Sequence, residues 1–436
     1  MHILYFHQHF STPDGAAGTR SYEMARRLLR EGHSVTMVCG SYSQGATGLA
    51  GPFHKGCRRG TIDGIDVVEF DMRYANEDGF IRRSGVFVKF ALASIKLALR
   101  EKYDLAFATT TPLTAGIPGI FARWLRGKPF VFEVRDLWPE LPRAMGVITN
   151  PVILGAMSVL EWASYRSATR CIGLSPGIVD GITRRGVPRS RVSMIPNGCD
   201  VELFSDSRPA ADASFRKANN ISDKQLLAVY CGTHGLANGL DAVVDAGIEL
   251  RNRGRTDIVL ALVGKGQEKA RLKERVKAER LSNVRFFDPV SKRRLTSLLG
   301  EADLGLQILR NIPEFAYGTS PNKFFDYLSV GLPVLNNYPG WLADMIEEHE
   351  LGFAVRPDSP AAFADALEQA AEDRAALVEM GHNAAAFARG AMNRDHLSKQ
   401  WVDWVTAGVG RVSLDGDGPY SAILSARPPA LAVEQK

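Results

Sequence analysis

Short apolar runs alternate with helical patterns along the first half of the chain. Tyr22, Ala25, Leu28 and Leu29 recur at helical spacing, while the arginines between them face outward. Nearly continuous apolar strands separated by helices are typical of a parallel, doubly wound sheet. We therefore expect strands at residues 3–6, 34–39, 65–70, 104–109, 129–134, 170–174 and 191–196.

The alternation restarts after residues 195–214, a segment rich in Pro, Asn, Asp and Ser that we interpret as a hinge. The pattern then predicts strands at residues 225–232, 257–264, 284–288, 302–309 and 333–337, with helices over 239–252, 266–280, 291–300 and 321–330. Beyond about residue 359 the chain reads as helical, and its last helix spans 394–407. These patterns predict an α/β protein of two Rossmann-like, doubly wound domains, at residues 1–200 and 201–390, with a flexible tail at 409–436.

Composition and charge narrow the classes of partner. The chain of 436 residues is long enough for two domains of about 200 residues each. Its net charge of +5 allows an anionic substrate or membrane surface but does not indicate nucleic acid. The five cysteines show no paired spacing, so we expect neither a zinc site nor disulfides. Without a signal peptide pattern or a long apolar run, a cytoplasmic location is expected.

The loop after the first strand is one candidate site. Gly15 and Gly18 allow close backbone approach, and the helix that follows offers free N–H groups. We expect Thr19 and Arg20, at the start of this helix, to face the ligand. The glycine spacing differs from the dinucleotide fingerprint, so a dehydrogenase is disfavoured, and a plain strand–helix turn stays the alternative.

A second candidate lies at the end of the strand at 129–134. Arg135 and Asp136 follow this strand directly, where ligands bind α/β sheets, and Glu133 shares a strand face with Arg135. A structural ion pair is the alternative interpretation.

Two further candidates lie in the second half. Gly232 and Thr233 end a strand and form a turn whose backbone amides suit phosphate oxygens. Lys323 adds positive charge at a helix start, and Asp326 could accept hydrogen bonds from ribose hydroxyls. The alternative is an ordinary helix with a capping acid. This start also holds small and polar residues, namely Gly318, Thr319, Ser320, Pro321 and Asn322.

Taken together, these motifs resemble the retaining glycosyltransferases of family 4, which have the two-domain GT-B fold. The resemblance rests on "IPNGCDVELF" (195–204), "NKFFDYLSVGLPVL" (322–335), "FEVRDLWPE" (132–140) and the glycine loop with its helix. The glycine loop with its helix and "FEVRDLWPE" are closer still to N-acetyl-fucosamine transferases of bacterial O-antigen and capsule assembly.

The resemblance implies two domains facing a cleft, with a crossover helix at 391–408 that packs back on the first domain. A nucleotide-sugar donor, a UDP-linked N-acetylated or deoxy hexose, would bind the second domain without any cofactor or obligatory metal, and a sugar acceptor would bind the first. The implied catalytic residues are Arg135, Asp136 and Lys323. The implied donor residues are Gly232, Thr233, Gly264, Val290, Gly318, Thr319, Ser320, Pro321, Asn322, Lys323 and Asp326. The implied acceptor residues are Gly15, Gly18, Thr19, Arg20 and Glu133.

The chain departs from the family pattern at several positions. The first acid of the family motif falls at Gly318, and the two cations that grip the diphosphate fall at Thr233 and Asn238. We therefore expect Lys323 and Arg135 to supply the positive charge. A UDP-sugar epimerase and a catalytically weak sugar-nucleotide-binding subunit are the alternative functions.

The segment 85–100 is apolar except for Lys89, Lys96 and Arg100, which share one side of a helix. The simpler interpretation is a packed helix with one solvated stripe. The other is a membrane surface contact through residues 82–102, at the inner face of the cytoplasmic membrane. That contact would suit the family, whose acceptors in such pathways are often sugars linked to a polyprenyl diphosphate.

Overall fold

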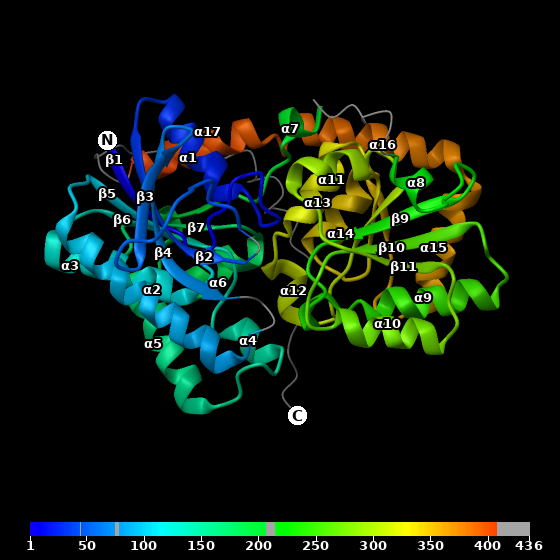
Figure 1. The fold of residues 1–436 in the computed structure, drawn as a ribbon, viewed down its shortest axis with the longest axis horizontal. Coiled ribbons are helices and arrows are strands. Elements are labelled where there is room, and N and C mark those ends of the chain that lie inside the picture. The colour runs from blue at the N-terminus through cyan, green and yellow to red at the C-terminus, as the bar shows by residue number, and fades with distance from the viewer. Residues whose placement is uncertain (44, 75–77, 206–213, 408–436) are drawn as a thin grey trace.

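The computed structural model describes residues 1–43, 45–74, 78–205 and 214–407, which form two α/β domains side by side (Figure 1). The described part of the first domain contains an eight-stranded sheet in the order β3-β4-β2-β1-β5-β6-β7-β8. All neighbouring strands are parallel except β3, which is antiparallel to β4. The strands are β1 (His2–Phe6), β2 (Ser34–Tyr42), β3 (Cys57–Ile62), β4 (Ile65–Tyr74), β5 (Leu105–Thr109), β6 (Phe130–Val134), β7 (Arg170–Gly173) and β8 (Val192–Met194).

The second domain contains a parallel sheet of six strands within the described residues, in the order β11-β10-β9-β12-β13-β14. In each sheet the strand order reverses beside the first strand, β1 or β9, and such a switch point opens a crevice at the carboxyl ends of the strands. The strands are β9 (Leu226–Cys231), β10 (Ile258–Val263), β11 (Val284–Phe287), β12 (Leu304–Gln307), β13 (Val334–Asn336) and β14 (Gly352–Ala354).

Helices cover both faces of each sheet (Figure 1). In the first domain they are α1 (Arg20–Arg30), α2 (Phe80–Arg100), α3 (Gly116–Arg126), α4 (Glu140–Ala144), α5 (Pro151–Ser167) and α6 (Pro176–Arg184). The later helices are α7 (Val201–Ser205), α8 (Phe215–Ala218), α9 (Asp241–Asn252), α10 (Lys269–Ala278), α11 (Lys292–Leu299), α12 (Pro313–Gly318), α13 (Asn322–Ser329), α14 (Trp341–Glu348), α15 (Pro360–Glu372), α16 (Arg374–Arg389) and α17 (Arg394–Thr406).

The last helix, α17, crosses from the second domain to the first and packs against α1, as expected (Figure 1). Trp401 of α17 is fully buried, with its ring centroid 4.7 Å from that of Phe107 and 6.0 Å from that of Tyr5. The indole of Trp404 donates a hydrogen bond to the carbonyl of Cys171 in β7. The end of the chain therefore completes the core of the first domain.

The sequence pattern did not predict β3 or α12. Residues 57–62 have too little apolar content to be recognised as a strand, and their partner β4 supplies the apolar side of the hairpin. The predicted hinge is described only outside residues 206–213, and the predicted tail lies outside the described residues. Among the helices described here, none is long and apolar enough to span a membrane.

Candidate active site

A cavity of about 320 Å³ opens between the two domains at the carboxyl ends of the strands. The loop before α1 forms its wall on the first domain. The turns after β9, β10 and β11 and the start of α13 form its wall on the second domain. The cavity is lined by residues that include Gly18 on the first domain and Gly232, Thr233, Asn238, Gly264, Val290, Lys292, Pro321, Asn322, Lys323 and Asp326 on the second.

The two domains approach closely at this cavity. A Cβ atom placed on Gly18 would lie 2.7 Å from Nδ2 of Asn322, so a side chain at residue 18 would collide with α13. The backbone N–H of Lys292 donates to the carbonyl of Gly15 at 3.3 Å. Glycine at residue 18 therefore lets the loop before α1 approach the side chain of Asn322 closely.

The turns after β9 and β10 are also constrained by backbone proximity. Gly264 has a φ of 149°, and a Cβ atom placed on it would lie 1.8 Å from the carbonyl oxygen of Gly232. No other residue fits there, because the two backbone segments touch. The floor of the cavity is consequently made of backbone, which suits the close approach of a ligand.

Lys323 lies on the first turn of α13, with its ammonium group 4.9 Å from the ring centroid of Tyr230 and 3.4 Å from Oδ1 of Asn238. Burial lowers the pKa of Lys323 from an ordinary 10.5 to about 8, and the neighbouring Cys231 and Asp326 oppose this only in part. The protein thus holds a cation in a site that lacks enough negative charge to balance it. Such a site favours an anionic ligand.

Lys292 is a second lysine in the cavity, and the sequence analysis did not identify it. It begins α11, and its ammonium group forms a buried ion pair with Oδ1 of Asp326. Lys292 and Asp326 are 34 residues apart, so no local sequence pattern indicates their contact. The predicted donor residue Val290 lies two positions before Lys292. Because one carboxylate oxygen of Asp326 binds Lys292, the other is left for a ligand hydroxyl.

The cavity brings together many of the predicted donor residues but not the segment 318–320. Gly318 ends α12 and does not line the cavity. The hydroxyl of Thr319 donates to the carbonyl of Phe315. The hydroxyl of Ser320 accepts a hydrogen bond from the backbone N–H of Asn197 at 3.1 Å. These three residues join elements together instead of facing the cavity.

Arg20 and Glu133 were expected to contact the acceptor, but both side chains are buried and form an ion pair at 2.9 Å. Arg20 also donates to the carbonyls of Ile195 and Pro196, and Trp401 donates to Glu133 at 3.0 Å. Burial acts to raise the pKa of Glu133, but Arg20, Arg135 and Thr109 together outweigh burial and the pKa is lowered. The pair therefore fixes the crossover helix and the start of the hinge, and is not available to a ligand.

Arg135 and Asp136 lie where predicted, at the carboxyl end of β6, but they do not line the 320 Å³ cavity. An Arg135 guanidinium nitrogen is 3.5 Å from Nε2 of His7, and Asp136 accepts a hydrogen bond from the hydroxyl of Thr111. Burial raises the pKa of Asp136, and Arg135 and Thr111 oppose the rise. Thr19, the remaining predicted acceptor residue, is buried at the start of α1.

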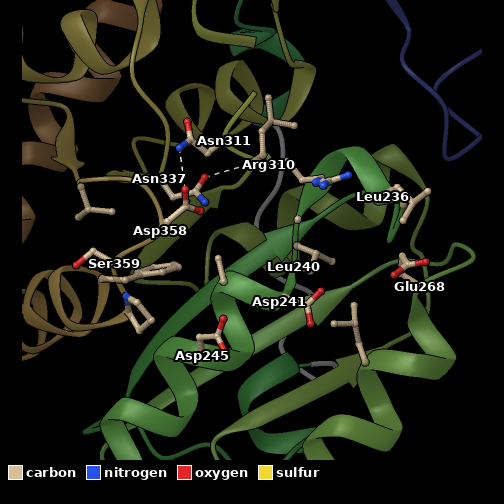
Figure 2. A pocket seen from close by; sticks show the side chains of 18 of the residues that line it. Leu236, Leu240, Asp241, Asp245, Glu268, Arg310, Asn311, Asn337, Asp358 and Ser359 are labelled. Atoms are coloured by element: carbon tan, nitrogen blue, oxygen red, sulfur yellow. Dashed lines mark hydrogen bonds between the residues drawn. The ribbon is translucent and has the colours of Figure 1, made fainter. Parts of the chain in front are cut away.

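A second cavity, of about 710 Å³, lies in the second domain, and residues of the turn at 235–239 line both cavities. Figure 2 shows its side chains: Asp241 and Asp245 on one side and Arg310 above them. Two acids of this cavity already have partners. Asp241 forms an ion pair with Arg271 at 2.5 Å, and Asp358 accepts a hydrogen bond from Asn311 at 2.7 Å. None of the catalytic, donor or acceptor residues implied by the resemblance lines this cavity.

Comparison with known proteins agrees with this architecture. Residues 15–198 match the glycosyl transferase 4-like domain, and residues 212–387 match the glycosyl transferases group 1 domain. WcaI of Escherichia coli K12, named for colanic acid biosynthesis, is 24% identical over 235 residues, which are 53% of this chain and 55% of WcaI. D-inositol 3-phosphate glycosyltransferase of Corynebacterium glutamicum is 26% identical over 210 residues, 46% of this chain and 48% of that protein. The chain thus spans about half the length of the curated relatives it matches.

Solved structures with the same fold cover nearly the whole chain. Sucrose-phosphate synthase of Thermosynechococcus elongatus superposes with a TM-score of 0.70 at 18% identity, over 92% of this chain and 97% of its own. HepE of Anabaena, in complex with UDP and glucose, superposes with a TM-score of 0.67 at 17% identity, over 93% of this chain and 100% of its own. WaaG, involved in lipopolysaccharide biosynthesis, superposes with a TM-score of 0.67 at 16% identity, over 93% of this chain and 99% of its own. The chain therefore belongs to the family 4 glycosyltransferases, with a glycosyl transferase 4-like first domain and a glycosyl transferases group 1 second domain in the GT-B fold.

Proposed function

We propose that this protein is a retaining glycosyltransferase that moves a hexose from a UDP-sugar to a lipid-linked sugar acceptor during assembly of a bacterial surface polysaccharide. The observation that carries the proposal is the cavity between the domains, where Lys323, Lys292 and Asp326 meet backbone turns. The named activities of the relatives support the same class of reaction.

In this proposal the diphosphate of the donor binds at Lys323. The ammonium group, the amides of the turn at Gly232 and Thr233, and the N–H groups at the start of α13 together supply the positive potential. Thr233 and Asn238 stand where the family has two cations. Lys323, which contacts Asn238, is therefore the main source of charge at this point.

The ribose of the donor is placed at Asp326. Lys292 binds Oδ1, which fixes the carboxylate in one orientation. Oδ2 then accepts from the ribose hydroxyls. UDP is the proposed nucleotide because solved structures of similar fold are complexes with UDP or a UDP-sugar.

Transfer would occur on one face of the donor sugar. The acceptor oxygen forms a bond to the anomeric carbon on the side from which the diphosphate oxygen departs, and the departing phosphate takes the acceptor proton. Lys323 stabilises the charge that develops on the diphosphate. Arg135 and Asp136, which follow β6 on the first-domain side, would orient the acceptor hydroxyl. No step requires a cofactor.

The names of two similar proteins support the proposed pathway and acceptor. WcaI is named for colanic acid biosynthesis, and WaaG acts in lipopolysaccharide biosynthesis, both of which concern the bacterial surface. A sugar on a polyprenyl diphosphate is the proposed acceptor, and the inner face of the cytoplasmic membrane is the proposed location.

A thermal-shift series with UDP, ADP, GDP and several UDP-sugars tests the donor site. UDP and one or more UDP-sugars should raise the melting temperature most, and Asp326→Asn should remove most of that rise. Lys277→Met, an exposed lysine of α10, is the matched surface control and should respond like the wild type. Equal shifts with all three nucleotides would contradict the proposed base.

The reaction itself is tested by incubating the protein, a UDP-sugar and a synthetic lipid-linked sugar, and by following the anomeric proton by NMR. A product with the anomeric configuration of the donor is expected. An inverted product would refute the proposed mechanism, and a changed sugar without any acceptor would identify an epimerase.

A further inference from the structure

The outward face of the first domain carries large apolar side chains in solvent. Most of the strongly exposed large apolar residues in the described chain lie between residues 88 and 162. We call this set the apolar face. It comprises Val88 and Leu92 on α2, Trp124 and Leu125 on α3, and Val152, Val159 and Trp162 on α5.

The three helices form one continuous layer, because α3 packs against both α2 and α5 (Figure 1). Trp124 is 63% exposed, yet its indole donates a hydrogen bond to the hydroxyl of Ser167 at the end of α5. This bond holds an exposed aromatic ring in a fixed position between two helices.

The first ten residues of α5 present apolar side chains to solvent. Residues 151–160 contain no charged side chain, and none of them is buried. Val152 is 77% exposed and Trp162 is 55% exposed. A contiguous stretch of exposed apolar side chains normally contacts protein or lipid, so this stretch lacks a covering layer within the described chain.

The charges on the three helices are almost all positive. The helices carry a single acid, Glu161, which is buried and paired with Arg185 at 2.7 Å. The basic residues on the helices are Arg82, Arg83, Lys89, Lys96, Arg100, Arg123, Arg126 and Arg166. An apolar surface edged by cations, with no exposed acid of its own, is complementary to anionic lipid.

We propose that the apolar face rests on the surface of an anionic lipid bilayer, with Trp124, Val152 and Trp162 inserted at the headgroup level. Tryptophan is enriched at this depth because its ring is apolar and its N–H is polar. A second copy of the chain is a poorer occupant, because it would bring two sets of cations together. The proposal rests on the proposed function for its purpose, which is to meet a lipid-linked acceptor. It also extends the contact expected at residues 82–102 to α3 and α5.

The test is co-sedimentation of the full chain with vesicles of phosphatidylglycerol and phosphatidylethanolamine, and with phosphatidylcholine vesicles for comparison. The wild type should bind the anionic vesicles and release at high salt. Val152→Glu and Trp162→Glu should each weaken binding roughly tenfold or more, because a charge must enter the interface. Lys96→Ala should weaken it roughly fivefold.

The matched control is Val378→Glu, a change at an equally apolar residue of α16 that is 59% exposed in the second domain. It should bind vesicles like the wild type. Absence of wild-type binding, or equal loss in Val378→Glu, would overturn the proposal. Dimerisation in light scattering that disappears in Val152→Glu, with vesicle binding unchanged, would assign the face to a second copy instead.

The UDP-induced rise in melting temperature is recorded for the same variants. A variant that leaves the membrane but keeps this rise shows that the two sites are separate. If UDP does not raise the melting temperature of the wild type, the proposed donor site is contradicted. The vesicle-binding result then tests the membrane proposal independently.

Discussion

Replacing Lys323 by methionine should weaken nucleotide binding and stabilise the free protein at the same time. Methionine keeps much of the length of the side chain but carries no charge. A hydrogen bond to a charged group contributes about 1.5–3 kcal/mol. Loss of the ammonium group should therefore raise the Kd for UDP by roughly 10- to 150-fold.

The gain in stability follows from the lowered pKa. Burial takes the pKa of Lys323 from 10.5 to about 8. Each pKa unit corresponds to about 1.4 kcal/mol, so the buried charge costs roughly 3 kcal/mol at pH 7. Loss of the contact with the ring of Tyr230 offsets about 1 kcal/mol of this. We expect Lys323→Met to increase the free energy of unfolding by roughly 2 kcal/mol.

Both effects of the substitution should diminish as the pH rises above 8. The folded pKa lies below the unfolded one, so the cost is fully present below about pH 8 and is relieved as the pH rises toward 10.5. The stabilisation by Lys323→Met should therefore shrink above pH 8. UDP affinity of the wild type should fall above pH 8, because the ammonium group loses its proton. The variant should show no such fall.

The assay is isothermal titration with UDP between pH 7 and pH 9.5, together with urea unfolding without nucleotide. Lys277→Met serves as control in both. If Lys323→Met unfolds more easily than the wild type at pH 7, the desolvation argument is wrong. If both proteins lose UDP affinity in parallel above pH 8, another group controls binding.

Three further changes test the architecture. Gly18→Val should lower kcat/KM by roughly tenfold or more with an unchanged melting temperature, because the new side chain holds the domains apart; steady-state kinetics measure this. Lys292→Met leaves Asp326 buried and unpaired and should cost about 3–5 kcal/mol in urea unfolding, while the double variant with Asp326→Leu should recover most of it. Trp401→Phe removes a donor to Glu133 and should cost about 2 kcal/mol by calorimetry. Because the pKa of Glu133 is lowered, the ion-pair stabilisation is present at neutral pH and is lost as the pH falls through that lowered pKa.

Much of the fold could be predicted because its strands are buried on both faces and read as apolar runs. The edge strand β3 could not be, since none of its residues is buried. Lys323 was found because it stands at a helix start among small and polar residues. Lys292 was not, because its role depends on Asp326, which lies on a different helix.

The charged pair Arg20–Glu133 shows the opposite limit. A cation at a helix start and an acid at a strand end match the pattern of a ligand site in an α/β sheet. Whether they face a ligand or each other depends on what covers them. Here the cover is Trp401, at the far end of the chain, and no local pattern contains that information.

The position of Trp401 has a consequence for synthesis of the protein on the ribosome. The first domain emerges early, but the indole that packs against both Tyr5 and Phe107 is made about 200 residues after that domain ends. At about 5–20 residues per second, the nascent domain waits on the order of ten seconds or more with that part of its interior open to water. During this interval it is a natural client for a chaperone, and truncation anywhere before α17 would make the exposure permanent.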